Sequence, residues 1–330
     1  MDLKTLTKSI QEFEGVTRKN SINNVISLLE DAYNVSGNVI IDIGDDASAI
    51  DIGNNQALLI AADGIWGQIM DVNPYWAGYC AVLVNVNDIA AMGAKPLAMV
   101  NIMSIANDEI YGELLTGIKD GCLKFGVPMV GGHLHPDATV DSLGVAIVGI
   151  AQKDKLVTSF NAQIGDKIIV AIDLDGKPHD MFALNWDTTY DKEAKLVQDQ
   201  ITAVQYLAEK DYIKSGKDIS NPGILGTLEM LLEASGKGAI VDLEDIPKAK
   251  GIEWDTWLKM YPGSGFVFTA SEKDCEAIID YLAKFSITAA VVGDVIDDES
   301  LFVVSGDEKI ELFNQKINPV FKGVWIIIIL

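Results

Sequence analysis

The chain has few cysteines, few histidines and few positive charges. The shortages of cysteine and of positive charge each exclude a class of protein. Its three cysteines, Cys80, Cys122 and Cys275, form no C-x-x-C pair, so neither a zinc knuckle nor a disulfide framework is predicted, and a reducing cytoplasm is expected. Lysine and arginine total 25 against 48 aspartate and glutamate, a net charge of −23. A nucleic-acid partner is therefore not expected, because it requires a basic face.

Long apolar runs and several familiar catalytic motifs are also missing. No run approaches the roughly 18 residues of a membrane span, and the start Met1–Lys4 lacks the apolar segment of a signal peptide. The tail Trp325–Leu330 is too short to span and is interpreted as a buried strand or a sticky end. The G-x-x-x-x-G-K-[S/T], G-x-S-x-G and H-E-x-x-H motifs are absent, so any nucleotide must be held by another scheme.

What is present is enough apolar material for a large core, in two series of strands and helices. The chain has 330 residues, 49% of them hydrophobic, which favours two domains. A polar segment at Gln152–Lys155 places the predicted boundary, giving domains 1–152 and 153–330. Mixed strands and helices in both halves predict an α/β or α+β fold. The expected helices are 5–32 with a break near 15–20, 76–92, 108–125, 192–209, 222–234 and 274–285; the expected strands are 39–41, 57–62, 97–104, 129–130, 143–151, 167–172, 239–241, 266–268, 289–295 and 301–304.

Carboxylates lie at or near the ends of the first apolar runs. Asp45 and Asp46 follow a short strand and a glycine, and Asp63 ends the next strand. Asp88 sits inside an otherwise apolar helix, where a buried carboxylate must be paired or bind a metal. Each motif also has an ordinary interpretation, as a polar turn or a solvent-facing charge. If the carboxylates converge, they make an oxygen site for Mg²⁺, which leaves part of its shell to substrate phosphates.

Two glycine-containing segments are further candidates for ligand binding. Gly131 and Gly132 follow a strand and are expected to form a turn that approaches a ligand closely, with His133 and His135 beside them. These histidines are interpreted as solvated loop residues, a general base or ligands of a transition metal. Segment Asp218–Gly226 opens a helix, with Asn221 as expected N-cap and Pro222 as first helical residue, and its free N–H groups suit an anion as well as plain capping.

In content and order these motifs resemble the aminoimidazole ribonucleotide (AIR) synthetase superfamily, which includes thiamine monophosphate kinase, selenophosphate synthetase and a hydrogenase maturation protein. The matching segments are Ile43–Ala47, Val84–Pro96, Gly131–Gly132, Ile164–Ile168, Asp218–Gly226 and Ser235–Gly238. Within the superfamily, Glu12–Lys19, Ala62–Gly67 and Trp76–Cys80 resemble the methanogenesis marker protein 2 group.

The resemblance implies a two-domain AIR synthetase-like fold, in which the N-terminal domains of two chains pair into a dimeric β-barrel and the C-terminal domain is an α/β sandwich. It implies ATP and Mg²⁺ as cofactors, a small-molecule substrate and a homodimer. Carried over by motif, the metal ligands are Asp45, Asp46, Asp63, Asp88 and Asp218. The nucleotide-binding residues are Asp88, Gly131, Gly132, Ser220 and Asn221, and the catalytic residues are His133 and Asp218.

The acceptor end of the site departs from each named relative. No cysteine precedes Cys80, unlike selenophosphate synthetases, and the tail lacks the cysteine of the hydrogenase maturation proteins. Segment Tyr261–Phe266 stands where thiamine monophosphate kinases carry Gly-Gly-Glu-Asp-Tyr. The predicted function is therefore ATP- and Mg²⁺-dependent phosphoryl transfer to a phosphate ester or an amide or carbonyl oxygen. The alternatives are a nucleotide-binding regulator or assembly factor without turnover, and a transition-metal site at His133 and His135.

Overall fold

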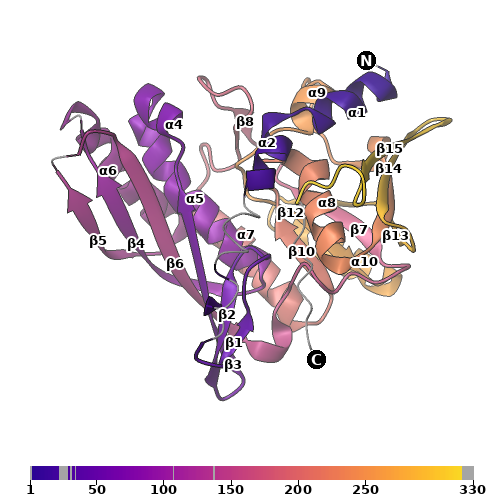
Figure 1. The fold of residues 1–330 in the computed structure, drawn as a ribbon, viewed down its shortest axis with the longest axis horizontal. Coiled ribbons are helices and arrows are strands. Elements are labelled where there is room, and N and C mark those ends of the chain that lie inside the picture. Colours follow the sequence, from indigo (N-terminus) through magenta and orange to yellow (C-terminus); the bar gives the residue numbers. More distant parts are fainter. Residues whose placement is uncertain are drawn as a thin grey trace.

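Two mixed sheets stand side by side, with helices packed between and around them (Figure 1). The computed structural model describes residues 2–21, 29, 32–33, 35–106, 108–136 and 138–321. The helical positions expected at Ile22, Val25 and Leu28, Asp137 of the histidine segment and the apolar tail Trp325–Leu330 lie outside these residues. Within the described residues no helix has both the length and the hydropathy for a membrane span.

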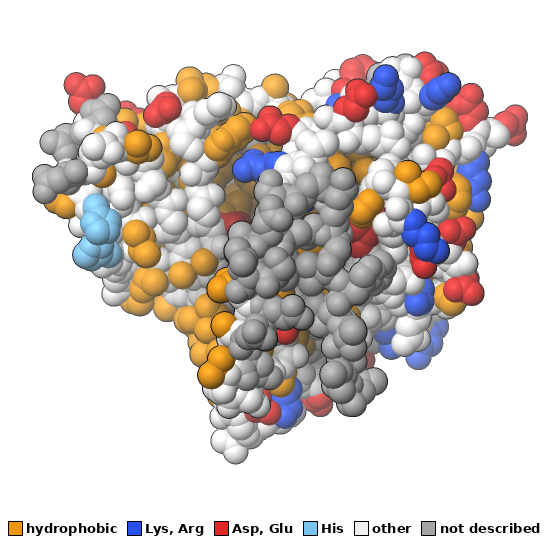
Figure 2. All heavy atoms as spheres, viewed as in Figure 1, with side chains coloured by type: hydrophobic (Ala, Val, Ile, Leu, Met, Phe, Trp, Pro, Cys, Tyr) orange, Lys and Arg blue, Asp and Glu red, His pale blue; other side chains and the backbone are white. Residues whose placement is uncertain are grey.

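The N-terminal sheet has six strands and one helix-covered face. Its order is β1 (Val39–Ile41), β2 (Ser48–Gly53), β3 (Gln56–Gly64), β6 (Ser142–Gln152), β4 (Lys95–Ser104) and β5 (Met129–His135), antiparallel except between β4 and β5. Helices α4 (Gly67–Val72), α5 (Pro74–Ala91) and α6 (Asp108–Phe125) cover one face. On the other face hydrophobic side chains stay exposed, as Figure 2 shows over this sheet. The described residues form no closed barrel, so the expected barrel needs more than one chain.

Helix α5 lies between the two domains, which is why it is apolar on nearly all sides. It packs against β3 and β6 of its own sheet and against β10 and α7 of the C-terminal half. Glycines let α6 approach it closely: a Cβ on Gly78 would lie 2.1 Å from the carbonyl oxygen of Leu114, and one on Gly117 would lie 1.9 Å from that of Tyr75. The helix ends at Ala91 with Met92 as its C-cap, and the φ of +69° at the following Gly93 confirms the predicted C-terminal glycine stop.

The C-terminal sheet has seven strands with helices on both faces. Its order is β10 (Ser215–Asp218), β12 (Gly265–Ala270), β7 (Lys167–Ile172), β13 (Thr288–Ile296), β11 (Gly238–Asp242), β14 (Ser300–Ser305) and β15 (Glu308–Asn314), with β11 and β14 parallel. Helices α7 (Ala194–Glu209) and α10 (Glu272–Ala283) share one core with α5, whereas α8 (Gly223–Ser235) and α9 (Trp254–Trp257) belong to the core on the opposite face. This half also contains a hairpin of β8 (Lys177–Pro178) and β9 (Trp186–Asp187) and a short 3₁₀ turn at Leu243–Asp245, and another 3₁₀ turn, Lys153–Lys155, follows β6.

The first helices pack on the C-terminal sheet, not on the N-terminal one. Leu3, Leu6 and Ile10 of α1 (Leu3–Gln11) lie in the core beside α8, and the Gln11 amide donates to the Leu312 carbonyl. Helix α2 (Glu14–Thr17) and the 3₁₀ turn Arg18–Ser21 then run toward the boundary of the two domains. The chain therefore begins within the C-terminal half in space, although those residues fall in the predicted domain 1–152.

Two local predictions are wrong. Gly131 and Gly132 do not form a turn, because β5 continues through them to His135. A Cβ on Gly132 would lie 2.6 Å from the carbonyl oxygen of Asn101 on β4, so the glycine serves close strand packing. Asn221 is not the N-cap of the following helix and Pro222 is not its first residue: the helix begins at Gly223, and Pro222 is an N-cap that makes no side-chain hydrogen bond.

Glu229 of α8 offers a test of this packing. It is fully buried, and among the described residues neither carboxylate oxygen has a hydrogen-bond partner. Burial, reinforced by Glu233, raises the pKa of Glu229 well above its usual value. The protonated Glu229 carboxyl group therefore contributes fully to the free energy of unfolding below the pKa that glutamate has in the unfolded chain. This contribution is lost as the pH rises through the pKa of Glu229 in the folded protein. We expect Glu229→Gln to raise the free energy of unfolding by about 1 kcal/mol or more at about pH 8, and by much less at about pH 4, in urea titrations.

The exposed Glu276→Gln serves as the matched control, since its side chain faces solvent on α10. Equal effects of Glu229→Gln at both pH values, or a loss of stability at the higher pH, would contradict this assignment.

Candidate metal and nucleotide site

Three of the predicted carboxylates converge at the junction of the two domains. Asp46 precedes β2, Asp88 lies on α5 and Asp218 ends β10, and one oxygen from each lies within 4.8 Å of the others. Residues separated by more than 170 positions in the chain thus share one small volume. We call Asp46, Asp88 and Asp218 the acidic trio.

The position of α5 against the C-terminal domain brings Asp88 to this place. The side-chain amide of the neighbouring Asn87 donates to the Gly263 carbonyl at 3.1 Å, and its oxygen lies 3.3 Å from the Ser264 hydroxyl. Both bonds are buried, where they fix the rotation of the helix. Asp218 follows from the pairing of β10 with β12, which sets Asp218 opposite Phe266.

Lys217 balances part of the charge. Its ammonium is buried, donates to Asp46 Oδ1 and lies 3.7 Å from Asp45 Oδ1. Although burial opposes the charged form, Asp46 and Asp45 together raise the pKa of this lysine above its usual range, so it stays protonated. The Lys217 charge therefore holds β10 against the segment before β2.

Asp45 has a different position from its neighbour. Its oxygens accept hydrogen bonds from the Ser159 amide and hydroxyl, both at 2.8 Å, and Asp45 is not part of the trio. Burial raises its pKa to about 6, against the opposing effect of Lys217. With both oxygens engaged, Asp45 joins the N-terminal sheet to the segment that leads into the second domain.

The electrostatics of the trio favour binding of a cation. Burial raises the pKa values of Asp88 and Asp218 well above normal, and neighbouring carboxylates, including Asp63, raise them further. Desolvation also raises the pKa of Asp63, with Lys19 opposing it, and lowers the pKa of Lys19. Like charges held together in a desolvated site are stabilised by a bound metal ion or by protons.

The donor set fits a hard divalent ion. Asp46 Oδ2 is buried and lacks a hydrogen-bond partner among the described residues, as expected for an oxygen reserved for another ligand. Oxygens bound to one Mg²⁺ at 2.0–2.1 Å lie at most roughly 4.2 Å apart. The separations within the trio, none above 4.8 Å, are close to this limit.

The site residues predicted on the histidine segment lie away from the acidic trio within a single chain. Gly131, Gly132, His133 and His135 are exposed on β5, at the edge of the N-terminal sheet opposite to β1. Two strands separate β5 from β3, which carries Asp63, a spacing of about 14 Å. The two imidazole rings lie edge to face with centroids 4.5 Å apart. Within one chain this segment does not meet the acidic trio.

Ser220 and Asn221 follow Asp218 closely, but their helix start offers less to an anion than expected. The Ile224 amide donates to the Leu258 carbonyl, the Gly223 amide to the Ser220 carbonyl and the Ser220 amide to the Thr227 hydroxyl. These N–H groups are therefore occupied by the protein itself.

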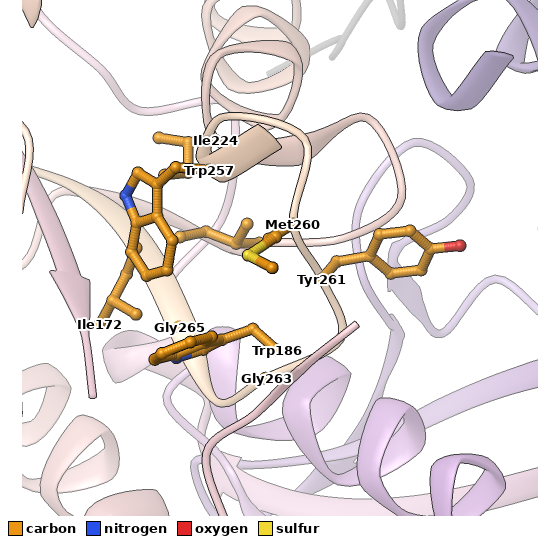
Figure 3. Close-up of a pocket in the computed structure, with 9 residues that line it drawn as sticks. Ile172, Trp186, Ile224, Trp257, Met260, Tyr261, Gly263 and Gly265 are labelled. Atoms are coloured by element: carbon orange, nitrogen blue, oxygen red, sulfur yellow. The ribbon is translucent and has the colours of Figure 1, made fainter. Parts of the chain in front are cut away.

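An apolar cavity of about 20 Å³ is lined by Ile219, the residue after Asp218 in the chain, and by residues of the C-terminal domain (Figure 3). Trp186 and Trp257 meet edge to face at 5.1 Å, and both indole N–H groups are bonded to backbone carbonyls. Met260 and Ile172 point into the same space, whereas the Tyr261 ring points away from it (Figure 3). A cavity of this size holds about one water, so it is a packing void and not a substrate pocket.

Sequence reasoning missed Lys217 and Lys19. Lys217 stands directly before Asp218 in Ser215–Asp218, a polar tetrapeptide that is buried throughout. The available signal was its adjacency to a predicted ligand. Lys19 lies in the segment that resembled a subgroup of the family, and only the path of the N-terminal helices brings it near Asp63.

Comparisons with known proteins identify the same family over most of the chain. Residues 44–151 match the model of the AIR synthase related protein, N-terminal domain, and residues 163–306 match its C-terminal domain. An uncharacterized protein of Methanocaldococcus jannaschii is 49% identical over 315 residues, 95% of this chain and 97% of the relative. The selenide, water dikinase of Colwellia psychrerythraea is 26% identical over 219 residues, 62% of this chain and 60% of the relative.

Solved structures show the same fold. T. maritima PurL complexed with ADP has a TM-score of 0.71 at 19% identity, covering 89% of this chain and 48% of PurL. AaThiL complexed with AMPPCP and TMP has a TM-score of 0.66 at 18% identity, covering 88% and 96%. The chain thus spans about half the length of PurL and nearly all of AaThiL. With family models matching both halves, the chain belongs to the AIR synthase related family.

Proposed function

We propose that this protein binds ATP with Mg²⁺ and transfers a phosphoryl group to a small-molecule acceptor. The observation that carries the proposal is the acidic trio with the unpartnered Asp46 oxygen. The solved relatives named with ADP and AMPPCP support nucleotide binding in this fold, and the similarity to a dikinase supports phosphoryl transfer.

In this proposal Asp46, Asp88 and Asp218 hold the metal and Asp45 supports the site from behind, while Asp63, which is not part of the trio, adds negative charge to it. The bound ion neutralises charge on the triphosphate. Lys217 pairs with Asp46, and the ammonium of Lys19 beside Asp63 offers a cation to the phosphates. Positioning and electrostatic stabilisation supply most of the rate in phosphoryl transfer, and these residues provide both. The acceptor is a phosphate ester or an amide or carbonyl oxygen.

The remaining residue assignments stay predictions. Asp218 is a metal ligand by position, and its proposed catalytic part is to hold that ion. Ser220 and Asn221 lie beside the trio and are proposed to contact the nucleotide. For Gly131, Gly132 and His133, the strand order argues against contact within one chain, so a nucleotide or acceptor would meet them only from a second copy. A cytoplasmic homodimer and membership of the methanogenesis marker protein 2 group likewise stay predictions.

A nucleotide-binding regulator or assembly factor is the second candidate. It is favoured by the segment Tyr261–Gly265, where the named kinase relatives carry acidic residues and this chain presents glycines and an apolar void. Such a regulator would bind Mg²⁺–ATP at the same trio without consuming it.

Thermal unfolding with nucleotide tests the proposal directly. We expect millimolar ATP to raise the midpoint when Mg²⁺ is present and much less in EDTA, because a ligand of the native state stabilises it by mass action. Asp88→Asn and Asp218→Asn should each remove most of that shift, because each replaces a negatively charged carboxylate of the proposed metal site with a neutral amide. Asp120→Asn, a surface carboxylate on α6, is the control and should keep the full shift.

ADP formation in the same samples separates the two candidates. Turnover that rises with an added acceptor and disappears in Asp88→Asn supports the transferase. A full Mg²⁺–ATP shift without turnover supports the regulator, and no shift in the unaltered protein would refute both.

A further inference from the structure

A second cavity lies at the other end of α5, lined by aromatic side chains. It measures about 300 Å³ and lies between Tyr75, Trp76 and Tyr79 of α5 and the segment 177–191 that carries the β8–β9 hairpin. This volume reaches the lower limit for small-molecule pockets. The cavity, which we call the aromatic cleft, is formed by both domains.

The polar atoms of the two buried rings, Trp76 and Tyr79, are already bonded, and the ring faces open to a ligand are those of the partly exposed Tyr75 and Tyr190. The Trp76 indole N–H donates to Asn185, and the Tyr79 hydroxyl bonds the Thr189 hydroxyl at 2.6 Å. Trp76 stacks between Tyr79 and His179, with ring centroids 5.5 and 4.7 Å away. Burial lowers the pKa of His179, so the imidazole is neutral at physiological pH. The wall is therefore a rigid stack of rings, in which the Trp76 N–H and the Tyr79 hydroxyl are engaged within the protein.

The charges of the cleft favour a cation. Three carboxylates, of Asp180, Asp187 and Asp191, line it against two lysines. Lys124 is occupied, since its ammonium donates to the carbonyls of Thr189 and Lys192. Both bonds that the structure shows to Asp187 end on Oδ1, which leaves Oδ2 for a ligand.

Lys177 shows how a cation sits in this cleft. Its ammonium lies 3.8 Å from the centroid of the exposed Tyr190 ring, and among the described residues it forms no salt bridge. The face of a tyrosine ring attracts positive charge through its quadrupole. Lys177 thus occupies, with a flexible side chain, a position that a ligand cation can take.

The aromatic cleft is separate from the acidic trio. Tyr79 and Asp88 are nine residues apart on one helix, which corresponds to about 13–14 Å along its axis. A phosphoryl group held at the trio does not reach the cleft. A hydrogen bond from the Ser264 amide to the Thr188 hydroxyl nevertheless joins the cleft segment to the residues that position α5.

We propose that the aromatic cleft is a second binding site, specific for a small organic cation with a planar ring, such as an N-alkylated nitrogen heterocycle. The cation lies over Tyr190 and beside Asp187, and its ring packs against Tyr75. This site is independent of the phosphoryl-transfer proposal, because none of its residues belongs to the trio.

Calorimetric titration at low salt with N-methylpyridinium, toluene and benzoate tests this proposal. N-methylpyridinium and toluene have nearly the same shape, so their difference reports the charge. We expect saturable binding of the cation, about tenfold tighter than toluene, and no binding of benzoate. Tyr190→Leu and Asp187→Asn should each weaken cation binding, whereas Lys177→Met should strengthen it by removing the competing ammonium.

Tyr206→Leu is the matched control, because Tyr206 is a surface tyrosine on α7 with Lys210 over its ring, outside the cleft. It should leave binding unchanged. Absence of saturable binding at millimolar cation, equal affinity for toluene or benzoate, or equal loss in Tyr190→Leu and Tyr206→Leu would overturn the proposal. Near-native thermal midpoints of these exposed-site variants exclude unfolding as a cause of lost binding.

Discussion

Replacing Lys217 with methionine is expected to lower the free energy of unfolding by about 3–5 kcal/mol at neutral pH. Methionine keeps most of the side-chain volume, so the loss arises from charge. The variant leaves Asp46 and Asp45 buried without the cation that compensates them. Breaking one half of a buried ion pair costs this much because the remaining charge stays desolvated.

The loss should depend on pH and on metal. As pH falls through about 6, the pKa to which burial raises Asp45, this carboxylate takes up a proton, and part of the loss should disappear. Millimolar Mg²⁺ should restore part of the stability at neutral pH, because an ion held by the acidic trio replaces the missing positive charge.

Lys192→Met is the matched control for this experiment. Lys192 forms a buried ion pair with Asp173 at 2.8 Å, so its loss should also destabilise the protein. Asp173 is not part of a group of three converging carboxylates among the described residues, and Mg²⁺ should not rescue this variant. Urea unfolding of both variants with and without Mg²⁺ measures the difference. Equal rescue of both, or of neither, would contradict a metal site at the trio.

The parts of the fold that sequence predicted are those with strong local signals. The helix containing Asp88 was predicted at 76–92 from its apolar body and the glycine that follows it, and the structure places it at Pro74–Ala91. Strand β10 was missed, because Ser215–Asp218 is polar and short and becomes a buried strand only through its pairing with β12. Tertiary context decides such a segment, and local propensity does not.

The candidate site shows the same division. Asp46, Asp88 and Asp218 were predicted as ligands, and the structure brings them together. Asp45 was predicted with them, but adjacent residues point differently, and Ser159, 114 positions away, engages its oxygens. The Gly131–Gly132 pair predicted a turn, yet the close approach of β4 at Asn101 also requires a glycine. The identity of a residue limits its possible structural roles, and the residues that it contacts in space determine which of these roles it has.

The exposed face of the N-terminal sheet leads to the second large prediction. Side chains that alternate outward on β3 and β4, among them Ile60, Val100 and Ile102, leave an apolar surface uncovered by helices (Figure 2). Contiguous exposed apolar surface of this kind marks an interface. We propose that two copies pair through this face, as the family resemblance implies, and expect the unaltered protein to be a dimer in solution.

Ile102→Asp should convert that dimer to a monomer at micromolar concentration. Ile102 is 60% exposed in the single chain, so the change leaves the monomer's core intact. In a two-fold interface the substitution occurs twice, and each copy buries an unpaired carboxylate, a cost of several kcal/mol for the assembly. The mass is measured by light scattering after size-exclusion chromatography. Leu123→Asp, on α6 and 67% exposed, adds the same charge on the helix layer behind the sheet and should remain dimeric. A dimer that survives Ile102→Asp, or an unaltered protein that is monomeric, would contradict the pairing of two copies through this face.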